Sequence, residues 1–243
     1  MAALLAGAAG AGGAEARFVG GPERVSLIEL YTSEGCSSCP RADRWIGALR
    51  DNPRLWREFV PVSFHVNYWD RLGWPDRFAS RQFTERQYAH ASAWGTGSVY
   101  TPCFVRDGAE WRPEGGTPSA VDGAPGVLTV TIGADGAAAV DFAPAGGRGG
   151  PYLAHLAILG SGFVSRVTAG ENGGSTLRHE FVALALADRV LAADASGSGF
   201  ATRFPLPKPQ VGDAPRTAIA AWVTRGGDLR PIQAAGGWLG SSL

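Results

Sequence analysis

Two cysteines separated by two serines carry the clearest chemistry in this sequence. Cys36 and Cys39 enclose a Ser-Ser pair, and Cys103 is the third cysteine of the chain. A Cys-x-x-Cys pair serves as a redox centre, as half of a zinc site or as a structural disulfide. A zinc site needs four ligands, usually from a second pair, and the sequence has no second pair. The motif therefore favours thiol–disulfide exchange, in which Cys36 attacks and Cys39 resolves.

A strand and a helix are predicted to position the cysteines. The run Val25–Thr32 is β-branched, aromatic and apolar, which predicts a buried strand. After the cysteines, four apolar residues at helical spacing predict a helix that ends at Asn52-Pro53: Ala42, Trp45, Ile46 and Leu49. Pro40 is compatible with this helix, because N–H groups of the first turn have no intrahelical partner. At the positive end of a helix, Cys36 is expected to be the more acidic and more exposed thiol.

The following elements complete an α/β half, which we place at residues 24–118. The run Val60–Asn67 alternates apolar and polar residues and predicts a second strand. Residues 75–93 are expected to form a helix, and Asp107-Gly108 is a typical turn between two short hairpin strands. One β–α–β crossover followed by an antiparallel hairpin predicts a mixed sheet with helices on its faces.

Short strands and glycine-containing turns dominate residues 126–243, which we treat as a second, β-rich domain. This pattern is typical of an antiparallel β-sandwich. The predicted strands are Val127–Ile132, Ala137–Phe142, Tyr152–Leu159, Phe163–Thr168, Thr176–Leu186, Phe200–Leu206, Thr217–Thr224 and Leu229–Ala234. The segment Thr176–Leu186 is also compatible with a helix. We expect no catalytic group in this domain, and we interpret His155 and His179 as structural residues.

Three segments occur in a fixed order in the first half: E-L-Y-T-S-E-G-C-S-S-C-P-R-A-D, H-V-N-Y-W-D-R-L-G-W-P-D-R-F and V-Y-T-P. The strand, Cys-Ser-Ser-Cys, helix order and Thr101-Pro102 before a strand resemble the thioredoxin-like superfamily. The segments more closely resemble an uncharacterised family of secreted bacterial proteins, domain of unknown function twelve twenty-three. The resemblance implies a thioredoxin-like fold with a cis Pro102 beside the disulfide. Asn67 stands where that family usually has aspartate, and residues 115–126 are poor material for the thioredoxin helix expected there.

Further site residues follow from the resemblance and from burial. Glu29 interrupts an apolar strand, and thioredoxins have a buried acid near this position, which implies a proton shuttle to Cys39. The alternative is a glutamate that is ion-paired or exposed at a sheet edge. Thr101, Trp69 and Trp74 are candidates for a substrate wall beside the disulfide, although packing in the core is the favoured explanation of the tryptophans.

Two other functions use the same cysteines. Soft thiolates suit Cu(I), and such a metal site would draw on Cys36, Cys39, Cys103 and His65. Alternatively, the cysteines form a structural disulfide in a surface-binding protein. Buried free cysteines and isolated strand histidines are usually structural. The competing interpretation of Cys103 and His65 is therefore a structural role.

Charge and composition exclude other classes of function. The 22 basic residues balance the 22 acidic ones, so there is no electrostatic footprint for nucleic acid or anionic lipid. No apolar run reaches the ~18 residues of a membrane span.

Residues 1–16 are small and apolar and end in Ala14-Glu15-Ala16, which is typical of a signal segment and predicts a periplasmic or secreted protein. We therefore predict an exported oxidoreductase of protein or small-molecule thiols whose only redox group is Cys36–Cys39.

Overall fold

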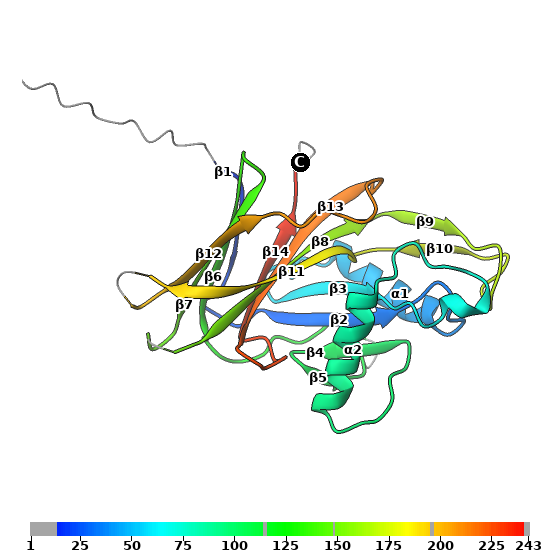
Figure 1. The fold of residues 1–243 in the computed structure, drawn as a ribbon, viewed down its shortest axis with the longest axis horizontal. Helices are drawn as coiled ribbons and strands as arrows, with labels where there is room; N and C mark the ends of the chain where they lie inside the picture. Colours follow the sequence, from blue (N-terminus) through cyan, green and yellow to red (C-terminus); the bar gives the residue numbers. More distant parts are fainter. Residues whose placement is uncertain (1–13, 114–115, 148, 195–196, 241–243) are drawn as a thin grey trace, which may run out of the picture.

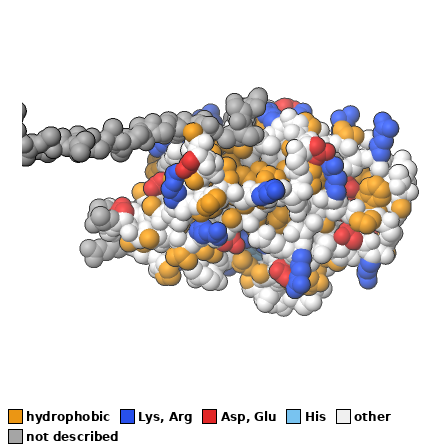
Figure 2. Space-filling model, turned by 45° about the horizontal axis from the view of Figure 1, so that its top comes forward, with side chains coloured by type: hydrophobic (Ala, Val, Ile, Leu, Met, Phe, Trp, Pro, Cys, Tyr) orange, Lys and Arg blue, Asp and Glu red, His pale blue; other side chains and the backbone are white. Residues whose placement is uncertain are grey.

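The computed structural model describes residues 14–113, 116–147, 149–194 and 197–240 (Figure 1). Within them lie a mixed sheet of 12 strands, a separate two-stranded sheet and two α-helices. Among the described residues, no helix is long and apolar enough to cross a membrane. On the face drawn in Figure 2, basic and acidic side chains are interspersed rather than segregated.

The first half contains the elements that the sequence predicts, and they form a mixed sheet. Their bounds are β2 (Ser26–Thr32), α1 (Cys39–Ala48), β3 (Phe59–His65), α2 (Arg81–Ala93), β4 (Cys103–Arg106) and β5 (Ala109–Trp111). A 3-10 turn at Leu49–Asp51 ends α1, and another lies at Asp70–Leu72. Strands β2 and β3 are parallel, whereas β4 is antiparallel to both β2 and β5.

The two helices lie on opposite faces of this sheet, and the alternation along β2 shows why. Successive side chains of a strand point to opposite faces. The Thr32 hydroxyl donates to Asp43 of α1, whereas the preceding Tyr31 lies on the side of Arg86 of α2. Figure 1 shows α2 crossing the strands of this half. Strand β2 ends at Thr32, opposite His65 at the end of β3, so the turn that leads into α1 lies at the ends of these two parallel strands.

The second half is almost entirely β-structure. Its strands are β6 (Gly126–Gly133), β7 (Ala137–Pro144), β8 (Tyr152–Ser161), β9 (Phe163–Arg166), β10 (Thr176–His179), β11 (Val182–Ala193), β12 (Phe200–Pro205), β13 (Arg216–Arg225) and β14 (Gln233–Trp238). The segment that was also compatible with a helix forms β10 and the start of β11. Phe181, with φ 55°, lies between these two strands. Here the strand prediction is confirmed.

One strand at the N-terminal end was not predicted. β1 (Ala14–Gly20) pairs antiparallel with β6, with Ala16 opposite Ile132. Residues 1–13 of the expected signal segment lie outside the described residues. The run A-E-A-R-F-V-G has little local β-signal of its own, so the pairing with β6 is what makes it a strand.

The sheet continues from one half of the chain into the other through β11. This strand pairs antiparallel with β8 along most of its length and with β12 near its end. At its start it runs parallel to β3, where Val182 lies opposite Ser63. The division into domains at residues 24–118 and 126–243 stays a prediction, because a shared sheet does not define folding units.

Two large buried clusters lie in the described part of the molecule, beside a smaller third one that includes Phe78 and Phe163. We call the first the apolar end: it lies between β6, β7 and β12 on one side and β8 and β13 on the other, and includes Val140, Phe142, Leu156 and Val223. The second, the disulfide end, is built on β2 and β3 and also takes in residues from the second half such as Leu159 and Trp222. Successive side chains of a strand point to opposite faces, so β8 and β13 contribute the side chains of one face to the apolar end and those of the other face to the disulfide end.

Candidate functional site

The Cys36–Cys39 disulfide lies at the junction predicted from the sequence. The two Cα atoms are 5.4 Å apart, β2 ends at Thr32, and Cys39 is the first residue of α1. Ser38 is the N-cap residue and Pro40 lies in the first turn. Cys36 is 1% exposed and Cys39 is 0% exposed, so the greater exposure expected for Cys36 is not found in this disulfide form.

A loop from the second half packs on the backbone around Cys36, and we call residues 167–175 the covering loop. The Asn172 side-chain amide donates to the carbonyl oxygens of Glu34 and Cys36, at 2.8 and 2.9 Å. The Glu171 carboxylate accepts from the backbone N–H of Ser37 at 3.1 Å. The second half therefore contacts the site through this loop, while the expectation that it carries no catalytic group stays a prediction.

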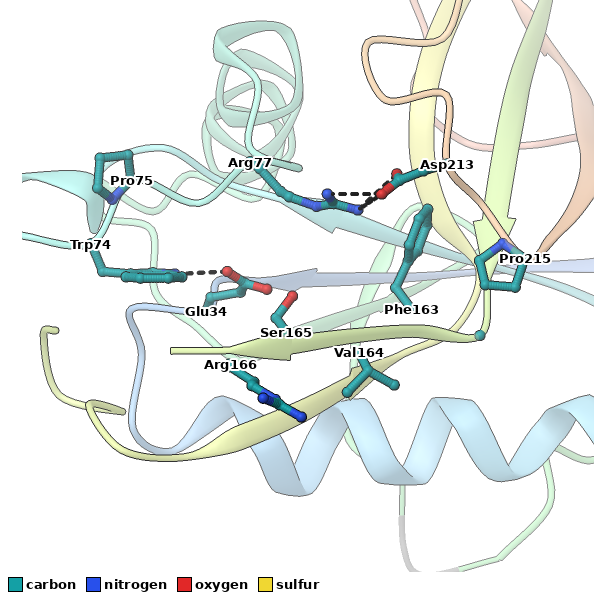
Figure 3. Close-up of a pocket in the computed structure, with 11 residues that line it drawn as sticks. Glu34, Trp74, Pro75, Arg77, Phe163, Val164, Ser165, Arg166, Asp213 and Pro215 are labelled. Atoms are coloured by element: carbon teal, nitrogen blue, oxygen red, sulfur yellow. Dashed lines mark hydrogen bonds and ion pairs between the residues drawn. The ribbon is translucent and has the colours of Figure 1, made fainter. Parts of the chain in front are cut away.

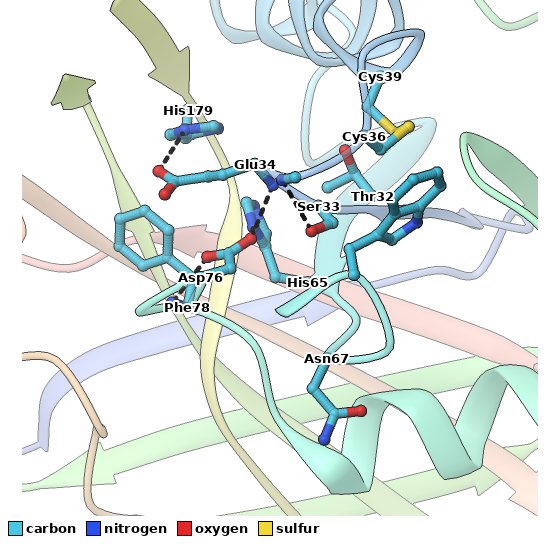
Figure 4. A network of polar contacts seen from close by, with 12 residues as sticks. Thr32, Ser33, Glu34, Cys36, Cys39, His65, Asn67, Asp76, Phe78 and His179 are labelled. Carbon is cyan, nitrogen blue, oxygen red and sulfur yellow. Dashed lines mark hydrogen bonds and ion pairs between the residues drawn. A yellow bond between two sulfur atoms is a disulfide. The ribbon is translucent and has the colours of Figure 1, made fainter. Parts of the chain in front are cut away.

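Glu34 lies in the loop between β2 and α1 that carries Cys36, and its carboxylate contacts residues from both halves of the chain. One carboxylate oxygen lies 3.0 Å from Nε2 of His179 (Figure 4), and the other accepts from the Trp74 indole N–H at 2.7 Å (Figure 3). Burial raises the pKa of Glu34, but the bonds to His179 and Trp74 outweigh this effect, and the net pKa is lowered. Glu34 is thus held as a buried carboxylate two residues before Cys36.

A second carboxylate–imidazole pair lies beside the first. His65 Nδ1 is 2.7 Å from Asp76, whose carboxylate also accepts from the backbone N–H groups of Glu34 and Phe78. Burial opposes charge on both side chains, but their mutual attraction raises the pKa of His65 and lowers that of Asp76. The His65 and His179 rings meet edge to face at 5.1 Å. Within the described chain, His65 Nε2 and His179 Nδ1 are buried without a hydrogen-bond partner.

Sequence reasoning did not single out Glu34, Asp43 or Asp76, and it gave His179 only a structural role. Asp43 offered a usable signal, because it falls on the helix face that buries Ala42 and Ile46. Asp76 gave no local signal. His179 lies 145 residues from its partner Glu34, so no spacing rule connects them.

Glu29 forms the ion pair that was the alternative to a proton shuttle. Arg86 donates to both carboxylate oxygens, at 2.7 and 3.0 Å, and the Tyr31 hydroxyl donates at 2.8 Å. His90 Nε2 lies 3.4 Å away. Burial raises the pKa of Glu29, but Arg86 and His90 lower it far below its ordinary value. A carboxylate held ionised by Arg86 on the α2 face is poorly suited to pass protons to Cys39.

Thr101-Pro102 is a cis peptide, as the resemblance implied. Cys103 pairs with Tyr31 in the sheet, and this register places Pro102 level with Thr32 at the end of β2. The Trp69 indole N–H donates to the Thr101 hydroxyl at 2.8 Å. Trp69 is half-buried and lies against the disulfide loop, since a Cβ added to Gly35 would be 3.0 Å from the Trp69 Cβ.

Trp74 lines a pocket of about 610 Å³ on the other side of Glu34 (Figure 3). Its wall includes Phe163 and an ion pair between Arg77 and Asp213, with nitrogen–oxygen distances from 2.8 to 3.1 Å. The cysteines do not line this pocket. Glu34 is the residue that faces both the pocket and the buried network.

The four residues of the alternative metal site make separate contacts. Cys36 and Cys39 are joined to each other, and His65 is bound to Asp76. Cys103 is a buried free thiol whose pKa burial raises to about 11. Among the described residues, no group of three or more histidine, cysteine, aspartate or glutamate side chains is arranged to hold a metal ion.

His155 lies away from this site, in the middle of β8. Its Nδ1 is 2.6 Å from Asp188, its Nε2 is 3.1 Å from the Thr224 hydroxyl, and its ring stacks on Trp222 at 5.1 Å. Both ring nitrogens are therefore satisfied, in agreement with a structural role.

Comparisons with known proteins place the chain without assigning a reaction. No curated protein matches it. A crystal structure of protein AGR_C_4864 from Agrobacterium tumefaciens is similar, with a TM-score of 0.61 and 22% identity over 91% of this chain and 97% of that chain. HBP35 of Porphyromonas gingivalis has a TM-score of 0.60 and 15% identity over 89% and 76%. At these identities the likeness concerns the fold alone. Residues 27–224 match one family model, and the chain therefore belongs to the family described as Protein of unknown function (DUF1223).

Proposed function

We propose that the protein is a thiol–disulfide oxidoreductase with a thioredoxin-like first half. The observation that carries the proposal is the Cys36–Cys39 disulfide between the end of β2 and the first residue of α1. The N-terminus of a helix stabilises a nearby thiolate and lowers its pKa, which makes that sulfur a better nucleophile near neutral pH. A disulfide of this kind persists in oxidising compartments, so the proposal includes a periplasmic or secreted location.

The proposed reaction exchanges one disulfide for another. In the reduced protein the Cys36 thiolate attacks a substrate disulfide, forms a mixed disulfide and releases one substrate thiolate. Cys39 then loses its proton and attacks the Cys36 sulfur, which re-forms Cys36–Cys39 and releases the second substrate thiolate. The substrate gains two electrons and the protein loses two. The reverse sequence oxidises a substrate dithiol, and the relative reduction potentials set the direction.

Access to Cys36 is part of the proposal, because both sulfurs are buried. A substrate sulfur reaches Cys36 when the covering loop moves, which breaks the two hydrogen bonds of Asn172 and the contact of Glu171. Trp69 and Thr101, joined by a hydrogen bond beside the disulfide loop, are the proposed contacts for the substrate chain. Trp74 extends this surface toward the pocket beyond Glu34.

The reduction potential of the pair tests this function. Equilibration with glutathione buffers, followed by thiol alkylation and mass measurement, gives the value for Cys36–Cys39. We expect a potential between about −270 and −120 mV, the range of known exchange catalysts. A potential below about −300 mV is typical of structural disulfides and would overturn the proposal. Cys103→Ala is the matched control and should leave the potential unchanged.

A further inference from the structure

Asp43 stands one helical turn after Cys39 on the buried face of α1. Positions i and i+4 of a helix are neighbours, with Cβ atoms about 5–6 Å apart. Helical side chains also lean toward the N-terminus, so the Asp43 side chain reaches back over the turn that carries Cys39. Cys39 is fully buried and Asp43 is only 7% exposed. Helix geometry therefore makes Asp43 and Cys39 neighbours on the same buried face of α1.

Titratable groups surround Asp43 from three other segments. The Thr32 hydroxyl at the end of β2 donates to its carboxyl at 2.9 Å. His65 of β3, His179 of β10 and Asp76 after β3 are close enough to act on its charge. Burial raises the pKa of Asp43, the two histidines and Thr32 lower it, and the net pKa is raised. A carboxylate with a raised pKa is a stronger base and a better match for a thiol.

Asp43 also borders solvent, which gives a proton a way out. It lines a pocket of about 130 Å³ together with Pro40, Arg44, Thr176, Leu177 and Arg178. Asp43 thus lines an opening at the surface and is also a helical neighbour of the buried Cys39. Glu29, the acid that the sequence singled out, does not compete for the role, because Arg86 holds it on the α2 face, whereas Glu34 and Asp76 are each paired with a histidine.

We propose that Asp43 is the proton acceptor for Cys39 during resolution of the mixed disulfide. The proposal rests on the thiol–disulfide function argued above. The Cys39 thiol transfers its proton to the Asp43 carboxylate, and the Cys39 thiolate attacks the Cys36 sulfur. The Cys36–Cys39 bond forms, the bond from Cys36 to the substrate sulfur breaks, and the substrate leaves as a thiolate. Protonated Asp43 then releases its proton through the pocket beside Arg44 and Arg178.

A reaction with a chromogenic aromatic disulfide separates the two chemical steps. The protein is first reduced with a dithiol, the dithiol is removed, and the aromatic disulfide is added. Attack by Cys36 releases one coloured thiolate in a fast phase, and attack by Cys39 releases a second in a slow phase. Asp43→Asn is compared with the wild type and with Asp51→Asn, which removes an exposed carboxylate just beyond the same helix.

The variant should slow the second phase in a pH-dependent way. At pH 7 we expect Asp43→Asn to slow this phase about 10²-fold, the lower end of what a positioned proton acceptor contributes. The deficit should shrink above pH 9, because Cys39 then ionises without help. Asp51→Asn should behave as the wild type. A purely structural defect would slow the phase by the same factor at every pH.

The outcomes distinguish this inference from the proposed function. Absence of the fast phase in the wild-type protein, or its persistence in Cys36→Ala, would contradict the oxidoreductase function itself. A normal fast phase with an unchanged slow phase in Asp43→Asn, or with a pH-independent deficit, would overturn the role of Asp43 alone. If Asp43→Asn does not fold, Thr32→Val removes the hydrogen bond to the carboxylate and should move the inflection of the slow phase to higher pH. An unmoved inflection would also overturn the proposal.

Discussion

The apolar end and the disulfide end are built on opposite faces of shared strands, yet they bury different chemistry. The cluster between β6, β7, β8 and β13 consists of apolar side chains. The disulfide end encloses buried carboxylates and imidazoles, among them Glu34, Asp76 and His179. Burying charge costs free energy unless each group finds partners. The difference shows that apolar burial suffices at the apolar end, whereas the disulfide end buries groups that need specific polar partners, as the proposed reaction would require.

The largest expected effect is on stability at the apolar end. Phe142→Ala removes a ring that is 1% exposed and packs 5.1 Å from Tyr152. The cavity should lower the free energy of unfolding by about 3–5 kcal/mol, measured by urea denaturation. The reduction potential of Cys36–Cys39 in the folded variant should not change. Asp141→Ala, at the exposed neighbouring position of β7, is the control. A changed potential would show that the two ends are not independent.

A comparable but smaller loss is expected when the ion pair of the disulfide end is broken. Arg86→Met leaves the Glu29 carboxylate buried with only the Tyr31 hydroxyl and His90 near it among the partners named above. We expect the free energy of unfolding to fall by about 3 kcal/mol, the low end for breaking a buried pair. Arg81→Met breaks an exposed pair with Glu85 on the same helix and should have little effect. Equal losses in both variants would contradict the distinction.

The covering loop gives a third effect, which concerns reactivity more than stability. Asn172→Ala leaves the carbonyl groups of Glu34 and Cys36 without their side-chain donor, at a cost of about 1–3 kcal/mol. The disulfide should then react faster with a small dithiol, measured by the appearance of alkylatable thiols. Glu171→Ala removes a more exposed contact and should accelerate the reaction less. An unchanged rate in Asn172→Ala would show that the loop does not control access.

The smallest effect is a pH dependence of stability that arises at His65. Its pKa in the folded protein is raised from an ordinary value of 6.5 despite its burial, because Asp76 attracts the charged imidazole. The contribution of His65 is therefore complete below pH 6.5 and is lost as the pH rises through the raised value. We expect the unfolding free energy of the wild type to decline in this window relative to His65→Gln. Parallel curves for the two proteins would contradict the assignment.

Local signals predicted the part of the site that is local in sequence. The apolar run before the cysteines, the helical spacing after them and the Asp-Gly turn gave β2, α1 and the β4–β5 hairpin. The groups that complete the site arrive from far along the chain: Asn172 contacts Cys36 across 136 residues. Pairing of β11 with β3 places β10 and its histidine near Glu34, and no periodicity in a single sequence reveals that pairing.

Glu29 shows why residue type alone left two interpretations open in the sequence. A buried acid before a cysteine pair was compatible with a proton shuttle or an ion pair, and only the partner decides between them. The partner, Arg86, lies 57 residues away on α2. Asp43 was the better signal, because an acid on the apolar face of a short helix needs a reason to be buried.

The central claim is that Cys36 is the sulfur that attacks substrates, and a trapped intermediate tests it most directly. Cys39→Ala removes the resolving sulfur, so a mixed disulfide formed at Cys36 should accumulate after reaction with glutathione disulfide. Peptide mass spectrometry then identifies the modified cysteine. The account predicts glutathione on Cys36 in Cys39→Ala and none on this peptide in Cys36→Ala. Modification of Cys103 alone, or no modification of the folded Cys39→Ala variant, would contradict it.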